Sequence, residues 1–120
     1  MKISILLPYK ENFSPQYPGA VSLFVYETTK ISKFKKDITV FGNTEFKKKF
    51  NLKYQNINLK KNLFKSQTKN YVKKFIDLEK KKNSVIIEVH NRPSYIQILS
   101  NEMKKKILTL YFHNDPLSMD

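Results

Sequence analysis

The sequence predicts a single α/β domain built on a parallel sheet. Three observations lead to this prediction: short apolar segments alternate with amphipathic ones, prolines and glycines stand at the junctions, and 120 residues suit one domain. Strands that alternate with helices pair in parallel through right-handed crossovers, so helices are expected on both faces of the sheet. Ligands of such sheets bind beyond the carboxyl ends of the strands. We therefore expect the working surface at three loops, Tyr9–Gly19, His90–Pro93 and His113–Asp120.

Five segments have the length and residue types of strands. They are Lys2–Pro8, Asp37–Gly42, Tyr54–Leu59, Ser84–His90 and Ile107–Phe112. The first segment is rich in β-branched residues and is stopped by Pro8, and its apolar stretch is shorter than that of a signal peptide. The third segment alternates in polarity, which is typical of a short edge strand. The fourth is the most apolar, which favours a buried strand.

Three further segments are expected to be helices. They are Ala20–Phe34, Asn62–Lys82 and Pro93–Lys104. The expected apolar faces of the first two comprise Val21, Phe24, Thr28, Ile31 and Phe34, and then Phe64, Tyr71, Phe75 and Leu78. The first segment begins with a sequence that also suits a strand.

The connections carry helix-starting signals of their own. Pro93 suits the first turn of its helix, with Asn91 or Arg92 at the cap. Residues 43–53 are expected to form a polar connection, with one short helix as an option. The dipeptide Asp115-Pro116 has the pattern of a helix cap followed by a first-turn proline, which predicts a further helix.

Composition excludes several classes of site. The chain has no cysteine, which excludes disulfides, thiolate zinc sites and cysteine nucleophiles and favours a reducing, cytoplasmic location. No apolar run reaches the ~20 residues of a membrane span. Sequence motifs of dinucleotide-binding loops, P-loops and serine-hydrolase elbows are also missing.

The formal net charge of +13 has three possible sources. Arg92 is the only arginine, so 22 of the 23 basic residues are lysines, and asparagine, isoleucine, phenylalanine and tyrosine are abundant too. A compositional bias towards AT-rich codons explains this pattern without any basic partner. Attraction to an anionic membrane surface is the second source, and nucleic acid is the third. Nucleic acid is disfavoured because such surfaces normally use arginine for bidentate contacts.

The first candidate site is the turn at Gly19 and Ala20, where the first helix is expected to begin. A glycine at this place lets a ligand approach free backbone N–H groups, and the helix dipole favours a phosphate there. The alternative is that Gly19 serves only as a turn residue.

The second candidate site is the end of the fourth strand. Strand alternation puts Glu88 and His90 on one face, and His90 at the carboxyl end can act as a base or a hydrogen-bond donor. A capping or structural histidine is the alternative, and Glu88 is expected to pair with a lysine or with His90. Arg92 either binds a carboxylate or phosphate or braces the loop.

The third candidate site follows the last strand at His113 and Asn114. His90 and His113 are the two histidines of the chain, and both end predicted strands. Asp115 is expected to be a helix cap. Two histidines and an aspartate are possible zinc or iron ligands, but a helical His-x-x-x-His pair and a further nearby ligand are missing, so no metal is expected.

These pieces, in this order, resemble the amino-terminal domain of GT-B glycosyltransferases of the family 4 type. The matching segments are Ile3–Pro8, Pro18–Val21, Val85–Pro93 and Leu110–Pro116. The repeated His-Asn element, followed first by Arg-Pro and then by Asp-Pro, is similar to the bacterial cell-surface and spore-coat polysaccharide branch. The resemblance implies a Rossmann-like three-layer domain and a retaining enzyme that moves a sugar from a nucleotide-sugar donor without a metal or other cofactor.

The resemblance also implies roles for single residues. Gly19 and Ala20 match the loop that approaches the donor phosphates, and His90 matches the catalytic strand-end histidine that contacts the transferred sugar or the acceptor. The expected acceptor-side residues are Asn91, Arg92, His113 and Asn114. The acceptor is expected to be a saccharide or a lipid-linked sugar, which leaves peripheral membrane association open. Ala20 departs from the family, which often has a second glycine there.

The family contains a second, carboxyl-terminal domain that holds the donor. Residues 1–120 have no counterpart of it, so they are expected to be the acceptor-side part of a longer two-domain chain and inactive alone. Two alternatives stay open. One is a basic α/β module that binds nucleic acid, and the other is a non-catalytic interaction domain.

Overall fold

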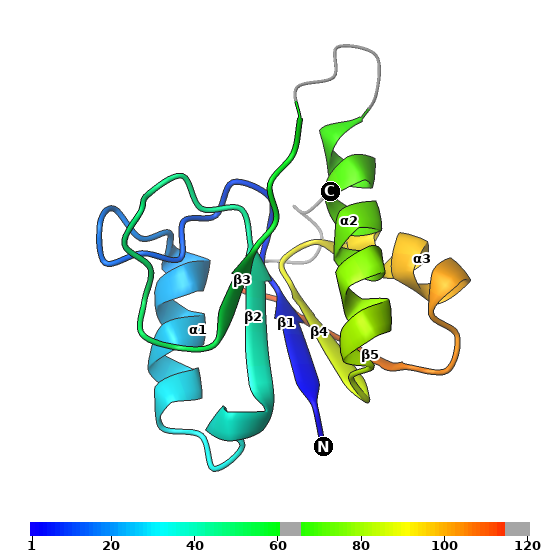
Figure 1. Cartoon of the computed structure of the whole chain (residues 1–120), viewed down its shortest axis with the longest axis horizontal. Coiled ribbons are helices and arrows are strands. Elements are labelled where there is room, and N and C mark those ends of the chain that lie inside the picture. The colour runs from blue at the N-terminus through cyan, green and yellow to red at the C-terminus, as the bar shows by residue number, and fades with distance from the viewer. Residues whose placement is uncertain (61–65, 115–120) are drawn as a thin grey trace.

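Five parallel strands form one sheet in the computed structural model, in the order β3-β2-β1-β4-β5 (Figure 1). The strands are β1 (Ile3–Leu6), β2 (Ile38–Gly42), β3 (Tyr54–Asn56), β4 (Ile86–His90) and β5 (Ile107–Tyr111). The structure describes residues 1–60 and 66–114. All four pairings are parallel, which confirms the predicted sheet.

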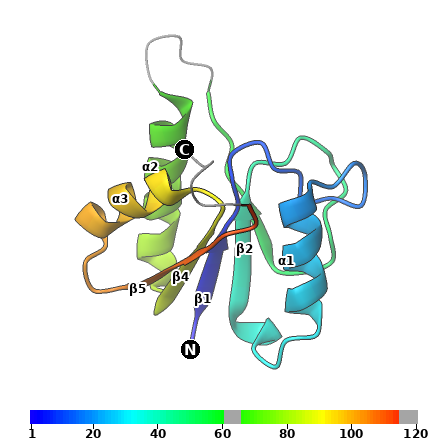
Figure 2. The ribbon, with the colours of Figure 1, turned by 180° about the vertical axis from the view of Figure 1, so that it is seen from behind.

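Helices cover both faces of the sheet, as Figures 1 and 2 show from opposite sides. Helix α1 (Ala20–Lys30) lies on one face, and α2 (Gln67–Lys82) and α3 (Pro93–Glu102) lie side by side on the other. A short 3₁₀ turn, η1 (Lys35–Asp37), precedes β2. The predicted Rossmann-like three-layer α/β fold is therefore confirmed. Within the described residues, no helix combines the length and apolar character that crossing a membrane requires.

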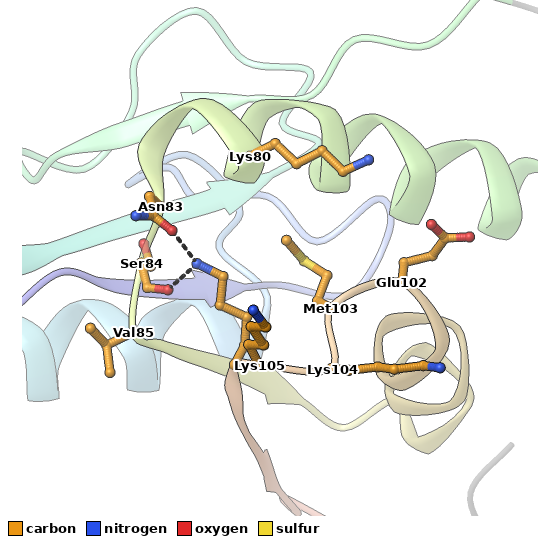
Figure 3. Close-up of a pocket in the computed structure, with 9 residues that line it drawn as sticks. Lys80, Asn83, Ser84, Val85, Glu102, Met103, Lys104 and Lys105 are labelled. Atoms are coloured by element: carbon orange, nitrogen blue, oxygen red, sulfur yellow. Dashed lines mark hydrogen bonds between the residues drawn. The ribbon is translucent and has the colours of Figure 1, made fainter.

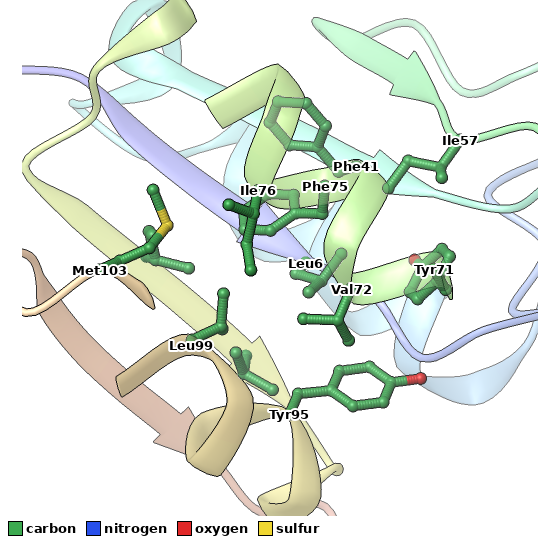
Figure 4. Close-up of a cluster of buried hydrophobic side chains, with 12 residues drawn as sticks. Leu6, Phe41, Ile57, Tyr71, Val72, Phe75, Ile76, Tyr95, Leu99 and Met103 are labelled. Atoms are coloured by element: carbon green, nitrogen blue, oxygen red, sulfur yellow. The ribbon is translucent and has the colours of Figure 1, made fainter. Parts of the chain in front are cut away.

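Alternation along β1 divides the core into two clusters. Leu6 points towards α2 and α3, where it joins Phe41, Phe75 and Leu99 in the larger cluster (Figure 4). Its neighbour Ile5 belongs to the smaller cluster under α1. Since successive side chains of a strand point to opposite faces, a one-residue shift of β1 would exchange the two sets and expose polar groups to the core.

A buried carboxylate fixes the amino end of the sheet. Glu79 of α2 is fully buried and accepts hydrogen bonds from the Ser4 hydroxyl at 3.2 Å and from the backbone N–H of Ser84 at 3.0 Å. Ser4 and Ser84 also bond to each other at 2.7 Å. These bonds tie the end of α2 to β1 and to the entry of β4.

The helices differ from their predicted faces in specific places. Val21 is buried as predicted and Phe24 is half-buried, but the other buried residues of α1 are Ser22, Val25 and Thr29. Of the remaining predicted residues, Thr28 is exposed, and Ile31 and Phe34 are 81% and 41% exposed beyond the end of the helix. The prediction was wrong at Ile31 because the helix ends at Lys30. Of the predicted α2 face, Tyr71 and Phe75 are buried and Leu78 is half-buried. Phe64 lies outside the described residues.

Residues 43–53 form the predicted polar connection, and the short helix considered there as an option is absent from the structure, which describes all of that segment. Polar side chains take the backbone there into loop conformations. Asn43 donates to the carbonyl of Ile57 at 2.9 Å, and the N–H of Thr44 donates to Asn56 Oδ1 at 2.8 Å. Such bonds compete with helical ones.

Candidate functional site

The sheet reverses its winding between β1 and β4. The chain leaves β1 towards α1 on one face and leaves β4 towards α3 on the other, so the two loops diverge and open a crevice between them. A cleft of about 320 Å³ lies at this point. It is lined by Pro8, Tyr9, Lys10, Glu11, Val21, Asn91 and Arg92. The structure thus brings together two of the three loops that the sequence singles out, and we call this space the switch cleft.

Two cleft residues have left-handed backbones. Lys10 has φ 66° and Asn91 has φ 59°, a region that asparagine tolerates well and lysine rarely adopts. Such conformations cost about 1–3 kcal/mol and concentrate at functional sites. The strained positions therefore mark the same loops as the cleft itself.

Two buried tyrosines hold the loop that contains Lys10. The Tyr71 hydroxyl donates to the carbonyl of Leu7 at 2.6 Å, and the Tyr95 hydroxyl accepts from the N–H of Tyr9 at 3.0 Å. Burial raises the pKa of Tyr71 well above its ordinary value, so the phenol stays protonated and keeps its donor. Because both rings belong to the packed helices α2 and α3, the loop after β1 is fixed from behind.

The carboxylate of Glu11 occupies the amino end of α1. Gly19 is the N-cap but supplies no side chain, and Glu11 Oε1 accepts from the N–H of Val21 at 3.2 Å instead. A Cβ atom at residue 19 would overlap the Glu11 carboxylate, so a larger residue there would displace that carboxylate, whereas the φ of −68° does not call for glycine. Gly19 and Ala20, expected at a donor phosphate, therefore lie beside the chain's own carboxylate.

The two histidines meet, as their positions at the ends of neighbouring strands suggest. His90 Nδ1 lies 2.8 Å from His113 Nε2, and His90 Nε2 lies 2.7 Å from Glu88 Oε2. His90 is 1% exposed, so neither of its nitrogens is open to a ligand. His113 is only partly buried. The accessible imidazole is thus His113, whereas the sequence pointed to His90 for the catalytic contact.

Aromatic rings surround the imidazole pair. Tyr111 stacks on His90 with ring centroids 5.3 Å apart, and Phe24 of α1 meets the edge of His113 at 4.9 Å. Burial, and then the neighbouring His90, lower the pKa of His113. These contacts favour a neutral His113 near pH 7.

Asn91 connects the pair to the switch cleft. Its Oδ1 accepts from the N–H of His113 at 3.0 Å, and its Nδ2 donates to Asn114 Oδ1 at 2.7 Å. Arg92 donates from Nη1 to the carbonyl of Asn91 at 2.7 Å. Three of the predicted acceptor-side residues are thus engaged in one hydrogen-bonded unit with His113, and Arg92 also borders the cleft.

Sequence reasoning missed three side chains of this site. Glu11, Lys10 and Phe24 carry no motif, and only their positions after β1 or early in α1 connect them to the cleft. Glu11 had one usable signal, since it is the single acidic residue between β1 and α1. Asp115, the further metal ligand considered for the two histidines, lies outside the described residues.

A larger pocket of about 560 Å³ lies at the opposite end of the sheet (Figure 3). Its walls include Lys80, Met103, Lys104 and Lys105, at the amino ends of β4 and β5. Lys106 closes one side by donating to Asn83 Oδ1 at 2.8 Å. We place the candidate site at the smaller switch cleft, because it lies at the carboxyl ends of the strands and Asn91, one of its lining residues, bonds directly to His113.

Fold and site together define a doubly wound parallel α/β domain with a polar cleft at the point where its winding reverses. Comparisons of the chain with protein-family models, with curated proteins and with solved structures give no match.

Proposed function

We propose that this chain is the acceptor-binding domain of a retaining glycosyltransferase that uses a nucleotide-sugar donor. The observation that carries the proposal is the convergence of the switch cleft and the imidazole pair through Asn91. Glycosyl transfer needs a hydroxyl held in position beside groups that handle charge and protons. The cleft offers the first requirement and the adjoining imidazoles offer the second.

The lining of the cleft suits a saccharide. Lys10, Glu11, Asn91 and Arg92 provide both donors and acceptors around a space of about 320 Å³. A sugar hydroxyl both donates and accepts, so a mixed lining matches it better than a purely cationic one. Tyr9 also lines the cleft, and an aromatic residue beside a sugar suits its C–H groups.

The donor phosphate has weaker support in this chain. The amino end of α1 favours an anion, but the Glu11 carboxylate holds that position. Lys10 and Arg92 are the cations of the cleft that a phosphate would meet. A donor held mainly by a second domain, with its phosphates facing Lys10 and Arg92 across the interface, fits this arrangement.

The proposal is tested by titrating the ¹⁵N-labelled chain with methyl glycosides of common hexoses and following its amide resonances. We expect saturable shifts at Tyr9–Glu11 and at Asn91–Arg92, with millimolar affinity. The variant Arg92→Ala should lose these shifts, whereas Lys80→Ala, which alters the pocket at the other end of the sheet, should keep them. Shifts confined to the larger pocket at the amino ends of β4 and β5 (the amino-end pocket) would contradict the proposal, and so would the absence of shifts with every hexose.

A further inference from the structure

Three ionisable side chains form an unbroken row beside the switch cleft. Glu88 Oε2 lies 2.7 Å from His90 Nε2, and His90 Nδ1 lies 2.8 Å from His113 Nε2. Glu88 and His90 come from the same face of β4, and His113 comes from the loop that leaves β5. The row runs from a partly exposed carboxylate through a buried imidazole to a partly exposed one.

Hydrogen-bond rules fix where the protons lie in this row. An ionised carboxylate only accepts, so His90 Nε2 carries a hydrogen and donates to Glu88. In the neutral pair His90 Nδ1 then accepts from His113 Nε2–H, which leaves Nδ1 of His113 as a bare base. Among residues 1–60 and 66–114, no hydrogen bond to His113 Nδ1 is present.

The surroundings favour charge on the inner imidazole. The elements packed against the pair contribute Glu88 from β4, the neutral phenol of Tyr111 from β5 and the uncharged Phe24 from α1. Glu88 is the only charged group in contact with the pair in the described part of the chain. Since it touches His90 and not His113, its attraction favours a positive charge on His90 and works against the desolvation of that buried ring.

We propose that Glu88, His90 and His113 form a proton relay in which His113 Nδ1 takes a proton from a ligand hydroxyl. The hydrogen on His113 Nε2 then passes to His90 Nδ1, and the resulting His90 imidazolium is held by the Glu88 carboxylate. His113 touches the ligand and is the candidate catalytic residue, whereas His90 and Glu88 act through it as positioning residues.

The choice of hydroxyl rests on the proposed function. There the acceptor hydroxyl loses its proton to His113, and its oxygen bonds to the anomeric carbon of the donor sugar. The bond from that carbon to the donor phosphate breaks, and its electron pair leaves on the phosphate oxygen. The relay gives up its proton to water after the product leaves.

The relay is tested without any sugar by imidazole ¹⁵N NMR of the whole chain between about pH 4 and 9. With two histidines in the sequence, the variant His113→Asn assigns both rings. We expect the pair to bind one proton in a first step, recorded mainly on His90, and a second proton only at clearly lower pH. Above the first step, His113 should carry its hydrogen on Nε2.

The variant Glu88→Gln should lower the midpoint of the first step by about one pH unit, because the anion that stabilises the imidazolium is lost. Glu102→Gln, which removes an exposed carboxylate at the end of α3, should leave the midpoint unchanged. Two independent titrations with ordinary midpoints would overturn the relay. An unshifted midpoint in Glu88→Gln would also overturn it. The tautomer of the unaltered chain gives a test that needs no variant, because a His113 hydrogen on Nδ1 above the first step would contradict the relay.

The two proposals fail separately. Loss of hexose binding at the switch cleft would contradict the glycosyltransferase proposal while the proton relay persists in the NMR titration. Independent titration of the two rings would overturn the relay and leave saccharide binding at the cleft untouched.

Discussion

At the residue scale, the small size of Gly19 and the position of the Glu11 carboxylate depend on each other. Gly19 leaves room for the Glu11 carboxylate where a Cβ atom would stand, and that carboxylate accepts a hydrogen bond at the α1 amino end, where the N-cap residue supplies no side-chain cap. A charged acceptor at a helix amino end contributes roughly 0.5–2 kcal/mol. The pair therefore stabilises the first turn of α1 and lowers the affinity of the same turn for an external anion.

This coupling predicts a non-additive pair of substitutions. Gly19→Ala should lower the free energy of unfolding by about 1–2 kcal/mol, because the new methyl group displaces the Glu11 carboxylate. In a Glu11→Ala background the same change should be neutral or stabilising by up to ~1 kcal/mol, since the backbone at residue 19 already has a φ of −68°. Urea denaturation of the four proteins measures the cycle. An equal cost of Gly19→Ala in both backgrounds would refute the coupling.

The two histidines show why a part of the site could not be predicted from the sequence. The pairing of His90 with His113 follows from their positions at the ends of strands, and the sequence carries that information. The burial of His90 depends on Phe24 and Tyr111, which contact it from α1 and β5 and are far from it in sequence. No local pattern records such a contact.

At the element scale, predictions succeeded where periodicity alone decides the structure. The existence of all five strands and of all three helices follows from alternating apolar segments. The predicted helix end was right at Lys82, where Asn83 caps α2, and wrong for α1. α1 stops at Lys30, four residues before the predicted end, and the exposed Ile31 is then a surface residue and not part of the core. In residues 43–53, the Asn43 side chain donates to a backbone carbonyl and Asn56 Oδ1 accepts from the N–H of Thr44, and such bonds compete with helical ones.

The ends of β4 and β5 are joined by one side chain. Asn91 bonds to the N–H of His113 and to the side chain of Asn114 while its own backbone is left-handed. Asn91→Gly keeps the backbone conformation and removes both bonds, so we expect faster hydrogen exchange of the His113 amide. Asn91→Ala adds the strain of a left-handed alanine and should be less stable than Asn91→Gly by about 1 kcal/mol.

A matched control is available in Asn83, whose φ of 56° at the end of α2 is also left-handed. Asn83→Gly should leave the exchange of the His113 amide unchanged, because that residue lies at the other end of the sheet. Equal exchange rates at His113 in the unaltered chain and in Asn91→Gly would show that the loop is held by other contacts.

At the scale of the whole molecule, the strand order creates the site. Because β1 and β4 are neighbours whose following helices lie on opposite faces, their loops must diverge, and a cleft results whatever the side chains are. The sequence predicts this edge of the sheet, but it gives no direct information on the cleft's volume or on the second pocket at the amino end. Both depend on how the loops pack.

The net charge of +13 is also a property of the whole molecule. Lysines lie close together around the amino-end pocket, where Lys80, Lys104 and Lys105 meet Glu102 as the single acidic wall residue. Among the described residues, the ion pairs are Lys30–Glu27 and the contact of His90 with Glu88. Most of the positive charge is therefore unpaired in the described part of the fold, and self-repulsion opposes folding.

Salt should consequently stabilise the chain. Raising NaCl from about 10 mM to about 150 mM shortens the Debye length from ~30 Å to ~8 Å and screens repulsion between surface lysines. We expect the melting temperature to rise by about 4 °C, equivalent to ~1 kcal/mol, in scanning calorimetry. The double variant Lys104→Glu and Lys105→Glu should melt at a higher temperature than the unaltered chain at low salt and should gain less from added salt.

Comparing salts of different anions distinguishes screening of the charges from the binding of a specific anion. Screening depends on ionic strength, so sodium chloride and sodium acetate at equal concentration should raise the melting temperature equally. An anion site at the lysine-rich pocket would respond far more strongly to phosphate than its ionic strength accounts for, and the double variant would abolish that excess. A melting temperature independent of salt would show that the lysines lie too far apart in the folded chain for their repulsion to affect its stability.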